Sequence, residues 1–256
     1  MTRWRGIGLL ASVLVESCQT ADRTPASDPR RAGGSSEVVP FRVPSDSEVD
    51  DRDMLLSLRR GRALLRDTRD SLSAHVGNKL ACVSCHAMNG VQKDVLPLVG
   101  VYARFPQYRS RTGKVDLIED RVNDCFERSM NGRAIEPGGE DMRDIVTYLA
   151  FLSRGIPAGA KVDGQGVPAL EPLRGDSARG APLFASTCSA CHGADGAGTN
   201  AAPPLWGPQS YNIGAGMARV RTTAAFIRSA MPITTERPPP LNGPDPNSTP
   251  LSFLTS

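Results

Sequence analysis

Two pentads of the form Cys-x-x-Cys-His constrain this chain of 256 residues more than any other feature. They occupy residues 82–86 (CVSCH) and 188–192 (CSACH). A lone Cys-x-x-Cys is also typical of a redox dithiol or of half a zinc site. A histidine directly after each pair is typical of covalent haem attachment, because the thiols bond the vinyl groups and the histidine ligates the iron. The pentads therefore predict two haem c groups. Their attachment residues are Cys82, Cys85, His86, Cys188, Cys191 and His192.

The first residues have the pattern of a bacterial export signal. Arg3 and Arg5 give a positive start, and residues 6–15 form an apolar stretch too short to span a membrane as a helix. We therefore predict a signal peptide over residues 1–18 and a periplasmic protein. Cys18 lies where a lipoprotein signal would be cut, so a lipid anchor through Cys18 and ordinary cleavage nearby both stay open.

The spacing of the pentads predicts two small domains. They lie about a hundred residues apart, which leaves room for a compact domain around each. The predicted fold class is mostly α, with two tandem class I-like cytochrome c domains, at residues 48–155 and 175–256. Residues 19–47 are rich in Ser, Pro, Arg and Asp and predict a flexible tether. Residues 156–174 are the predicted linker.

Apolar periodicity places helices around both pentads. Residues 51–70 have apolar side chains at helical spacing and lead toward the first pentad. Residues 139–153 are the predicted closing helix of the first domain, because acidic residues stand in the first turn and Gly155 follows the end. Asp176 is a predicted N-cap for a helix that runs into Cys188.

The second domain lacks a recognisable closing helix. Pro, Gly and Asn recur after Met231 and exclude a long helix there. One hypothesis is a frameshifted or truncated C-terminus downstream of Leu241, and the alternative is a disordered tail.

The iron of each haem takes a second axial ligand, and few histidines are free for this role. The chain has three histidines, two of them in the pentads, so His75 alone remains and two bis-histidine haems are excluded within one chain. Cys125 lies downstream of the first pentad, where the distal ligand of a cytochrome c domain is found. A thiolate there would lower the haem potential. The alternatives are a buried structural cysteine and Met130 as the ligand.

The second haem has two candidate distal ligands. Met231 precedes Pro232, and a Met-Pro pair at this distance after the pentad is typical of small cytochromes c. Met217 is the alternative, and core packing is the ordinary role of either methionine.

The chain resembles the dihaem c-type thiosulfate dehydrogenases of the TsdA type, which form tetrathionate. The similarity runs from about Val76 to Arg237. The segments that carry it are VGNKLACVSCH, DRVNDCFERSMNGR, DIVTYLAFLSRG, CSACHGADGAG, PPLWGPQSYNIGAGM and AAFIRSAMP. The resemblance implies that His86 and Cys125 ligate the first haem and that a methionine ligates the second. Some members use a neighbouring lysine as an alternative ligand. Here Ala230 precedes Met231, so no lysine switch is expected.

The resemblance also implies basic residues beside the first haem. Arg121 and Arg111 match the family pattern, with Arg109 as an alternative to Arg111, and Ser129 falls on it too. In a partly desolvated cleft, the Coulomb repulsion between two thiosulfate dianions is on the order of several kcal/mol. Fixed cations are needed to offset this repulsion. The guanidinium fork suits sulfonate oxygens. The candidate catalytic residues are Cys125, Arg121, Arg111 and Ser129. The wider cluster around Cys125 consists of Arg104, Arg109, Arg111, Arg121 and Arg133. The alternative role for this cluster is a solvated surface or a docking face for an acidic partner.

The family implies oxidation of two thiosulfate to tetrathionate, possible in either direction. Cys125 would either bond the outer sulfur of the substrate or stay on the iron and tune its potential. Electrons would pass through the second haem to an external cytochrome c or copper protein. The alternatives are a dihaem electron carrier and the haem subunit of a multi-protein sulfur-oxidising complex. A net charge of +3 does not indicate a nucleic-acid partner.

Overall fold

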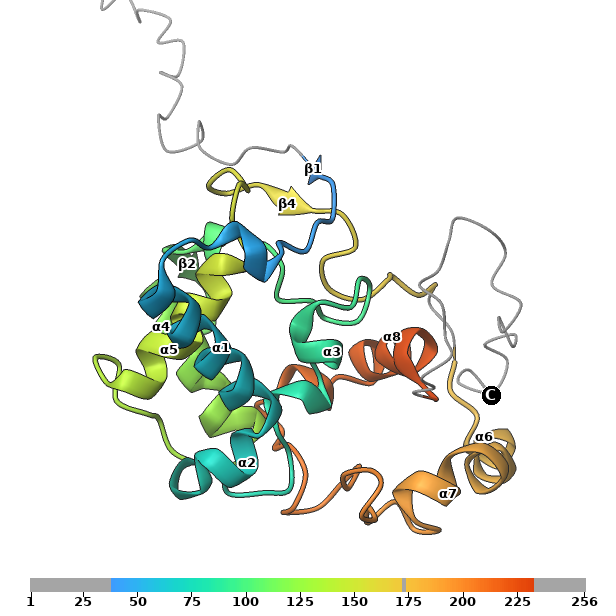
Figure 1. Ribbon diagram of the computed structural model, residues 1–256. Helices are drawn as coiled ribbons and strands as arrows, with labels where there is room; N and C mark the ends of the chain where they lie inside the picture. The colour runs from blue at the N-terminus through green and yellow to red at the C-terminus, as the bar shows by residue number, and fades with distance from the viewer. Residues whose placement is uncertain (1–37, 172–173, 233–256) are drawn as a thin grey trace, which may run out of the picture. The chain divides into compact units, whose positions relative to one another are not determined.

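The computed structural model describes residues 38–171 and 174–232 (Figure 1). The predicted signal peptide, Cys18 and the unusual C-terminal sequence all lie outside the described residues. Helices dominate the described part, as predicted, and the few strands are two or three residues long. None of the helices described is long and apolar enough to cross a bilayer.

The first half of the chain contains five α-helices and one π-helical turn among the described residues. The helices are α1 (Arg52–Arg66), α2 (Thr68–Ser71), α3 (Ala87–Gly90), α4 (Ile118–Asp124), the π-turn η6 (Cys125–Ser129) and α5 (Glu140–Phe151). The short 3-10 turns here are η2 (Asp46–Glu48), η3 (Ser73–His75), η4 (Cys82–Ser84) and η5 (Tyr102–Arg104). An antiparallel pair joins β2 (Gln107–Arg109) to β3 (Lys114–Asp116).

The core of this half lies between α1 and α5. Asp51 caps α1 by accepting from the backbone N of Met54 at 2.7 Å, which satisfies one of the free amides of the first turn. The helices bury Leu58 of α1 against the apolar face of α5, where Met142 and Tyr148 are almost fully buried. The predicted helices over 51–70 and 139–153 are thus confirmed as α1 with α2 and as α5.

Gly61 allows α1 to approach α5 closely, which gives a prediction about stability. A Cβ at this position would overlap the carbonyl oxygen of Asp144, which belongs to helix backbone and cannot rotate away. We expect Gly61→Ala to lower the free energy of unfolding by about 3 kcal/mol. Denaturant unfolding of the holoprotein, followed by circular dichroism, measures this change.

Gly138 supplies the matched control, because a Cβ there would meet no atom within 4 Å. We expect Gly138→Ala to stay within about 0.5 kcal/mol of the wild type. Equal stability of the two variants would contradict the close approach at Gly61.

Residues 38–47 correct the predicted tether. The strand β1 (Val38–Val39) pairs in parallel with β4 (Lys161–Val162), inside the predicted linker. Asp46 pairs with Arg62 of α1, and the hydrogen bond from Arg62 lowers the pKa of Asp46. The prediction of a flexible chain up to residue 47 is therefore wrong for this stretch. Two of its apolar side chains, Val39 and Phe41, pack on the core and hold it.

The second half is built around the second pentad. Its helices are α6 (Ser177–Leu183), the π-turn η7 (Phe184–Cys188), α7 (Ser189–His192), the 3-10 turn η8 (Gly216–Ala218) and α8 (Val220–Ala230). The side chain of Asp176 accepts from the backbone N of Arg179 at 3.1 Å, which confirms the predicted N-cap. The helix continues through η7 into the pentad, also as predicted.

Candidate active site

The fold brings the first pentad and Cys125 together. The thiols of Cys82 and Cys85 lie close enough to Cys125 for its charge to raise their pKa, and His86 lies close enough to Cys125 to lower the pKa of its thiol. Helix α4 and the π-turn η6 deliver Cys125 to this place, while the short turn η4 carries the pentad. A single-turn π-helix is a frequent device at functional sites, because it redirects one side chain. The predicted attachment residues and the predicted distal ligand thus share one site.

Backbone contacts between two chain segments fix this arrangement. The backbone N of Gly77 donates to the carbonyl of Met130 at 2.8 Å, and the backbone N of Arg133 donates to the carbonyl of His75 at 3.1 Å. A Cβ at Gly77 or at Gly132 would overlap the backbone of the opposite segment. The segment that enters the pentad and the segment that leaves the Cys125 turn are therefore held backbone to backbone.

Both pentad histidines are oriented for a metal. His86 lies with Nδ1 at 2.6 Å from the carbonyl oxygen of Leu96, and His192 with Nδ1 at 3.0 Å from that of Pro203. A carbonyl can only accept, so Nδ1 carries the proton and Nε2 keeps its lone pair for a ligand bond. This donor set, two thiols and a free Nε2 in each pentad, fits haem c.

Arg121 is the cation beside Cys125. The two residues are four apart, so they lie on one helix face, and Nη1 of Arg121 donates to Sγ of Cys125 at 2.8 Å. Burial alone raises the pKa of Cys125, but the charge of Arg121, together with the neighbouring His86, outweighs burial and lowers it to about 6. Burial raises the pKa of Cys82 and Cys85 to about 12. As free thiols, Cys125 therefore ionises more readily than Cys82 and Cys85.

The guanidinium of Arg121 keeps donors free for a second anion. Among the described residues its hydrogen-bond partner is Cys125. An arginine has five N–H donors, so the remaining ones can bind the oxygens of a substrate that approaches the thiolate.

The other predicted basic residues have different partners. Arg109 donates from Nη1 to Asp116 at 3.1 Å and to Asp124 at 2.6 Å, and both carboxylates are buried. Arg109 is therefore neutralised and braces β2 against α4, which favours Arg111 over it. Arg111 is exposed and donates to the carbonyl of Gly214. Arg121 and Arg111, the two predicted substrate arginines, thus have different partners: Arg121 contacts a thiol and Arg111 a backbone carbonyl.

The alternatives to Cys125 have structural roles. Met130 is only 2% exposed and belongs to the hydrophobic core. His75 lies with Nδ1 at 3.0 Å from the carbonyl of Ala134, and its ring packs edge-on against Phe126. Ser129 ends the π-turn that begins at Cys125, and its carbonyl accepts from Asn78 at 2.9 Å.

The second site is less enclosed than the first. Cys191 is exposed and Cys188 is half-buried, whereas His192 is buried. Met217 and Met231 both pack against one apolar cluster, which joins Ala87 and Val95 of the first half to Phe226 and Ala230 of α8. This packing does not distinguish between the two candidate ligands.

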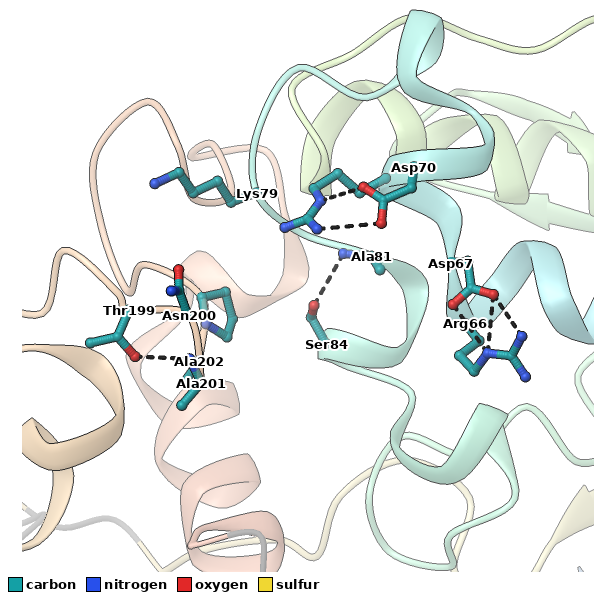
Figure 2. A pocket seen from close by; sticks show the side chains of 12 residues that line it. Arg66, Asp67, Asp70, Lys79, Ala81, Ser84, Thr199, Asn200, Ala201 and Ala202 are labelled. Carbon is teal, nitrogen blue, oxygen red and sulfur yellow. Dashed lines mark hydrogen bonds and ion pairs between the residues drawn. The ribbon is translucent and has the colours of Figure 1, made fainter.

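A cavity of 330 Å³ lies beside the first pentad, and its lining does not include Cys125 (Figure 2). It is lined on one side by Ala81 and Ser84 and on the other by residues 199–203. The arginines that line it, Arg66 and Arg69, each pair with the adjacent aspartate, at 2.7 and 2.9 Å. Its charge is therefore largely balanced, and we do not assign the candidate active site to it.

Comparison with known proteins agrees with this architecture. Residues 72–158 match the family described as SoxA/TsdA, cytochrome c domain, and residues 177–251 match the family described as cytochrome c. A thiosulfate dehydrogenase of Allochromatium vinosum is 44% identical over 207 residues, which are 77% of each chain. The chain belongs to the thiosulfate dehydrogenase family. The predicted family and the predicted tandem cytochrome c fold are confirmed, and haem c is confirmed as the type of cofactor.

Other members show how much of the family this chain represents. A thiosulfate dehydrogenase of Psychrobacter arcticus is 38% identical over 211 residues, which cover 78% of this chain and 64% of that one. The solved structure of thiosulfate dehydrogenase (TsdBA) from Marichromatium purpuratum has a TM-score of 0.70 at 37% identity. The match covers 76% of this chain and 45% of that one, so this chain spans less than half of the solved chain.

Proposed function

We propose that this protein oxidises two thiosulfate to tetrathionate at the site formed by the first pentad, Cys125 and Arg121. The observation that carries the proposal is the 2.8 Å contact of the Arg121 guanidinium with the Cys125 sulfur, placed beside Cys82, Cys85 and His86. A cation next to a thiolate suits a reaction in which two sulfur dianions meet a sulfur nucleophile. The names of the relatives support the same substrate.

Two haem c groups are part of this proposal. Haem c supplies one-electron redox chemistry when it is bound. Cys82 and Cys85 would hold the first group, and His86 and Cys125 would supply the ligands of its iron. Cys188, Cys191 and His192 would hold the second, with Met231 as the preferred further ligand and Met217 as the alternative. A thiolate favours a low potential and a thioether a higher one, so electrons run from the first domain to the second.

The chemistry of the chain itself centres on Cys125. Its thiolate sulfur forms a bond to the outer sulfur of one thiosulfate, and the two electrons released would go, by way of the redox groups that the pentads would hold, to the external acceptor. The outer sulfur of a second thiosulfate then attacks the outer sulfur of this adduct. Tetrathionate departs and the Cys125 thiolate is restored, so the sum is 2 S₂O₃²⁻ → S₄O₆²⁻ + 2 e⁻. Arg121 binds the sulfonate oxygens and offsets the repulsion between the anions.

Arg111 and Ser129 complete the proposed site. Arg111 lies at the surface, where it can attract an anion before the anion reaches Arg121. Ser129 lies one turn after Cys125 and offers a hydroxyl donor from the same segment. A periplasmic location, an optional lipid anchor at Cys18 and an external cytochrome c or copper protein as the electron acceptor belong to the proposal as well.

A turnover assay with the purified holoprotein tests this function. Thiosulfate and ferricyanide are added, with no other protein present. We expect two ferricyanide to be reduced for each tetrathionate formed. A protein that only carries electrons would not reduce ferricyanide when thiosulfate is the sole electron donor. That result would contradict the proposed enzymatic function.

The haem subunit of a multi-protein complex is the second candidate, because the matching family description joins SoxA with TsdA. Such a subunit would form no tetrathionate until its partner proteins were added, so the same assay separates the two functions.

A further inference from the structure

The π-turn that carries Cys125 ends in carbonyls whose partners come from distant segments. The last four carbonyls of a helix have no partner inside the helix. Here the carbonyl of Glu127 accepts from Nδ2 of Asn212 at 3.1 Å, and the carbonyl of Arg128 accepts from the backbone N of Asn212 at 3.1 Å. Asn212 follows the second pentad in sequence. The helix end beside the first pentad is therefore completed by the second domain.

Asn78 satisfies the next carbonyl and connects three segments. Its Nδ2 donates to the carbonyl of Ser129 at 2.9 Å and to the carbonyl of Ser210 at 2.8 Å. Its Oδ1 accepts from the backbone N of Leu80, two residues before Cys82, at 3.0 Å. The side chain is 6% exposed, so water cannot easily replace these bonds.

Residues 208–214, which we name the capping segment, make further contacts with the first half. Nδ2 of Asn131 donates to the carbonyls of Pro208 and Ser210, at 3.1 and 2.7 Å. Arg111 donates to the carbonyl of Gly214. The capping segment therefore touches both the Cys125 turn and one of the predicted substrate arginines.

We propose that Asn78 is a positioning residue that holds Cys125 against the first pentad, and that the capping segment of the second domain is part of the catalytic centre. Asn78 acts through the backbone of Ser129, one turn after Cys125, and does not touch the reacting atoms. The proposal deepens the function above and rests on Cys125 as a ligand. It means that the second domain supports the chemistry as well as carrying electrons.

Asn78→Asp is the decisive variant, because it keeps the shape and the acceptor for Leu80 but replaces both donors by a carboxylate oxygen. In the full-length holoprotein we expect amide hydrogen exchange in residues 125–132 to become about tenfold faster. We also expect a smaller thiolate-ligated fraction of the first haem by electron paramagnetic resonance. The kcat should fall about tenfold while KM stays within about twofold, since binding groups are retained.

Asn200→Asp is the matched control, since it makes the same charge change on an exposed loop. It should leave exchange, spectrum and kcat unchanged. If Asn78→Asp does not fold, Asn212→Ala removes the donor to Glu127 and the acceptor for the backbone N of Gly214, and it keeps the backbone bond to Arg128. We expect about threefold faster exchange in that variant.

Two outcomes separate the positioning role from the function on which it rests. A wild-type protein without a thiolate signal would contradict the ligand role of Cys125, yet faster exchange in Asn78→Asp would still support the cap. Wild-type exchange and a wild-type spectrum in Asn78→Asp would overturn the positioning role of Asn78.

Discussion

Replacing Cys125 by glycine or methionine should lower thiosulfate turnover about a thousandfold or more while both haems stay attached. Either change removes the sulfur that bonds the substrate, and neither touches the pentad thiols that hold the haem. In Cys125→Met, a thioether in place of the thiolate should also raise the potential of the first haem. Tetrathionate formation measures the turnover, the pyridine haemochrome spectrum measures haem content, and a redox titration gives the potential.

Met217→Leu is the control for the Cys125 variants. It removes a candidate sulfur ligand of the second domain and leaves Cys125 in place. If Met231 is the distal ligand, Met217→Leu should keep its turnover. A Cys125→Met protein that oxidises thiosulfate at the wild-type rate would contradict the proposed mechanism.

Replacing Arg121 by glutamine should lower kcat/KM for thiosulfate about a hundredfold. Two effects combine. The substrate loses the donors that bind its oxygens, and the thiolate of Cys125 loses the charge that stabilises it. Since Arg121 lowers the pKa of Cys125, its removal raises that pKa, and the thiolate forms only at higher pH. The rising limb of the pH profile of kcat/KM should therefore move to higher pH.

Arg121→Lys and Arg143→Gln test whether this loss is specific. Lysine restores the charge but not the fork, so we expect partial activity and a pH profile close to the wild type. Arg143 is exposed on α5 and donates only weakly, at 3.4 Å, to the carbonyl of Gly138. Its glutamine variant should behave as the wild type. An unchanged pH profile in Arg121→Gln would show that Arg121 does not control Cys125.

Local patterns predicted the helices and the pentads well. The cap at Asp176, the closing helix over 139–153 and the helix into Cys188 each depend on residues close in sequence. The ligand count also needed no structure, because a chain with three histidines leaves few options beside Cys125. These features were accessible because the chemistry of each lies within a few residues.

Contacts between distant segments escaped sequence reasoning. Residues 38–47 end a longer stretch that is rich in Ser, Pro, Arg and Asp, yet pairing with β4 and the Asp46–Arg62 ion pair order them. Arg109 and Arg111 look alike in sequence, but only Arg109 of the two forms ion pairs with the buried carboxylates of Asp116 and Asp124. Asn78 and Asn212 carry no signal of their own. Their roles follow from carbonyls that lie 51 and 85 positions away in the chain.

Anaerobic mixing of the oxidised holoprotein with thiosulfate tests the central claim most directly. No electron acceptor and no other protein is added, and the haem absorption bands are followed while tetrathionate is measured. We predict direct reduction, with one tetrathionate formed for every two electrons taken up. Bands that stay oxidised until a second sulfur-oxidising protein is added would contradict the claim that this chain alone holds the catalytic site.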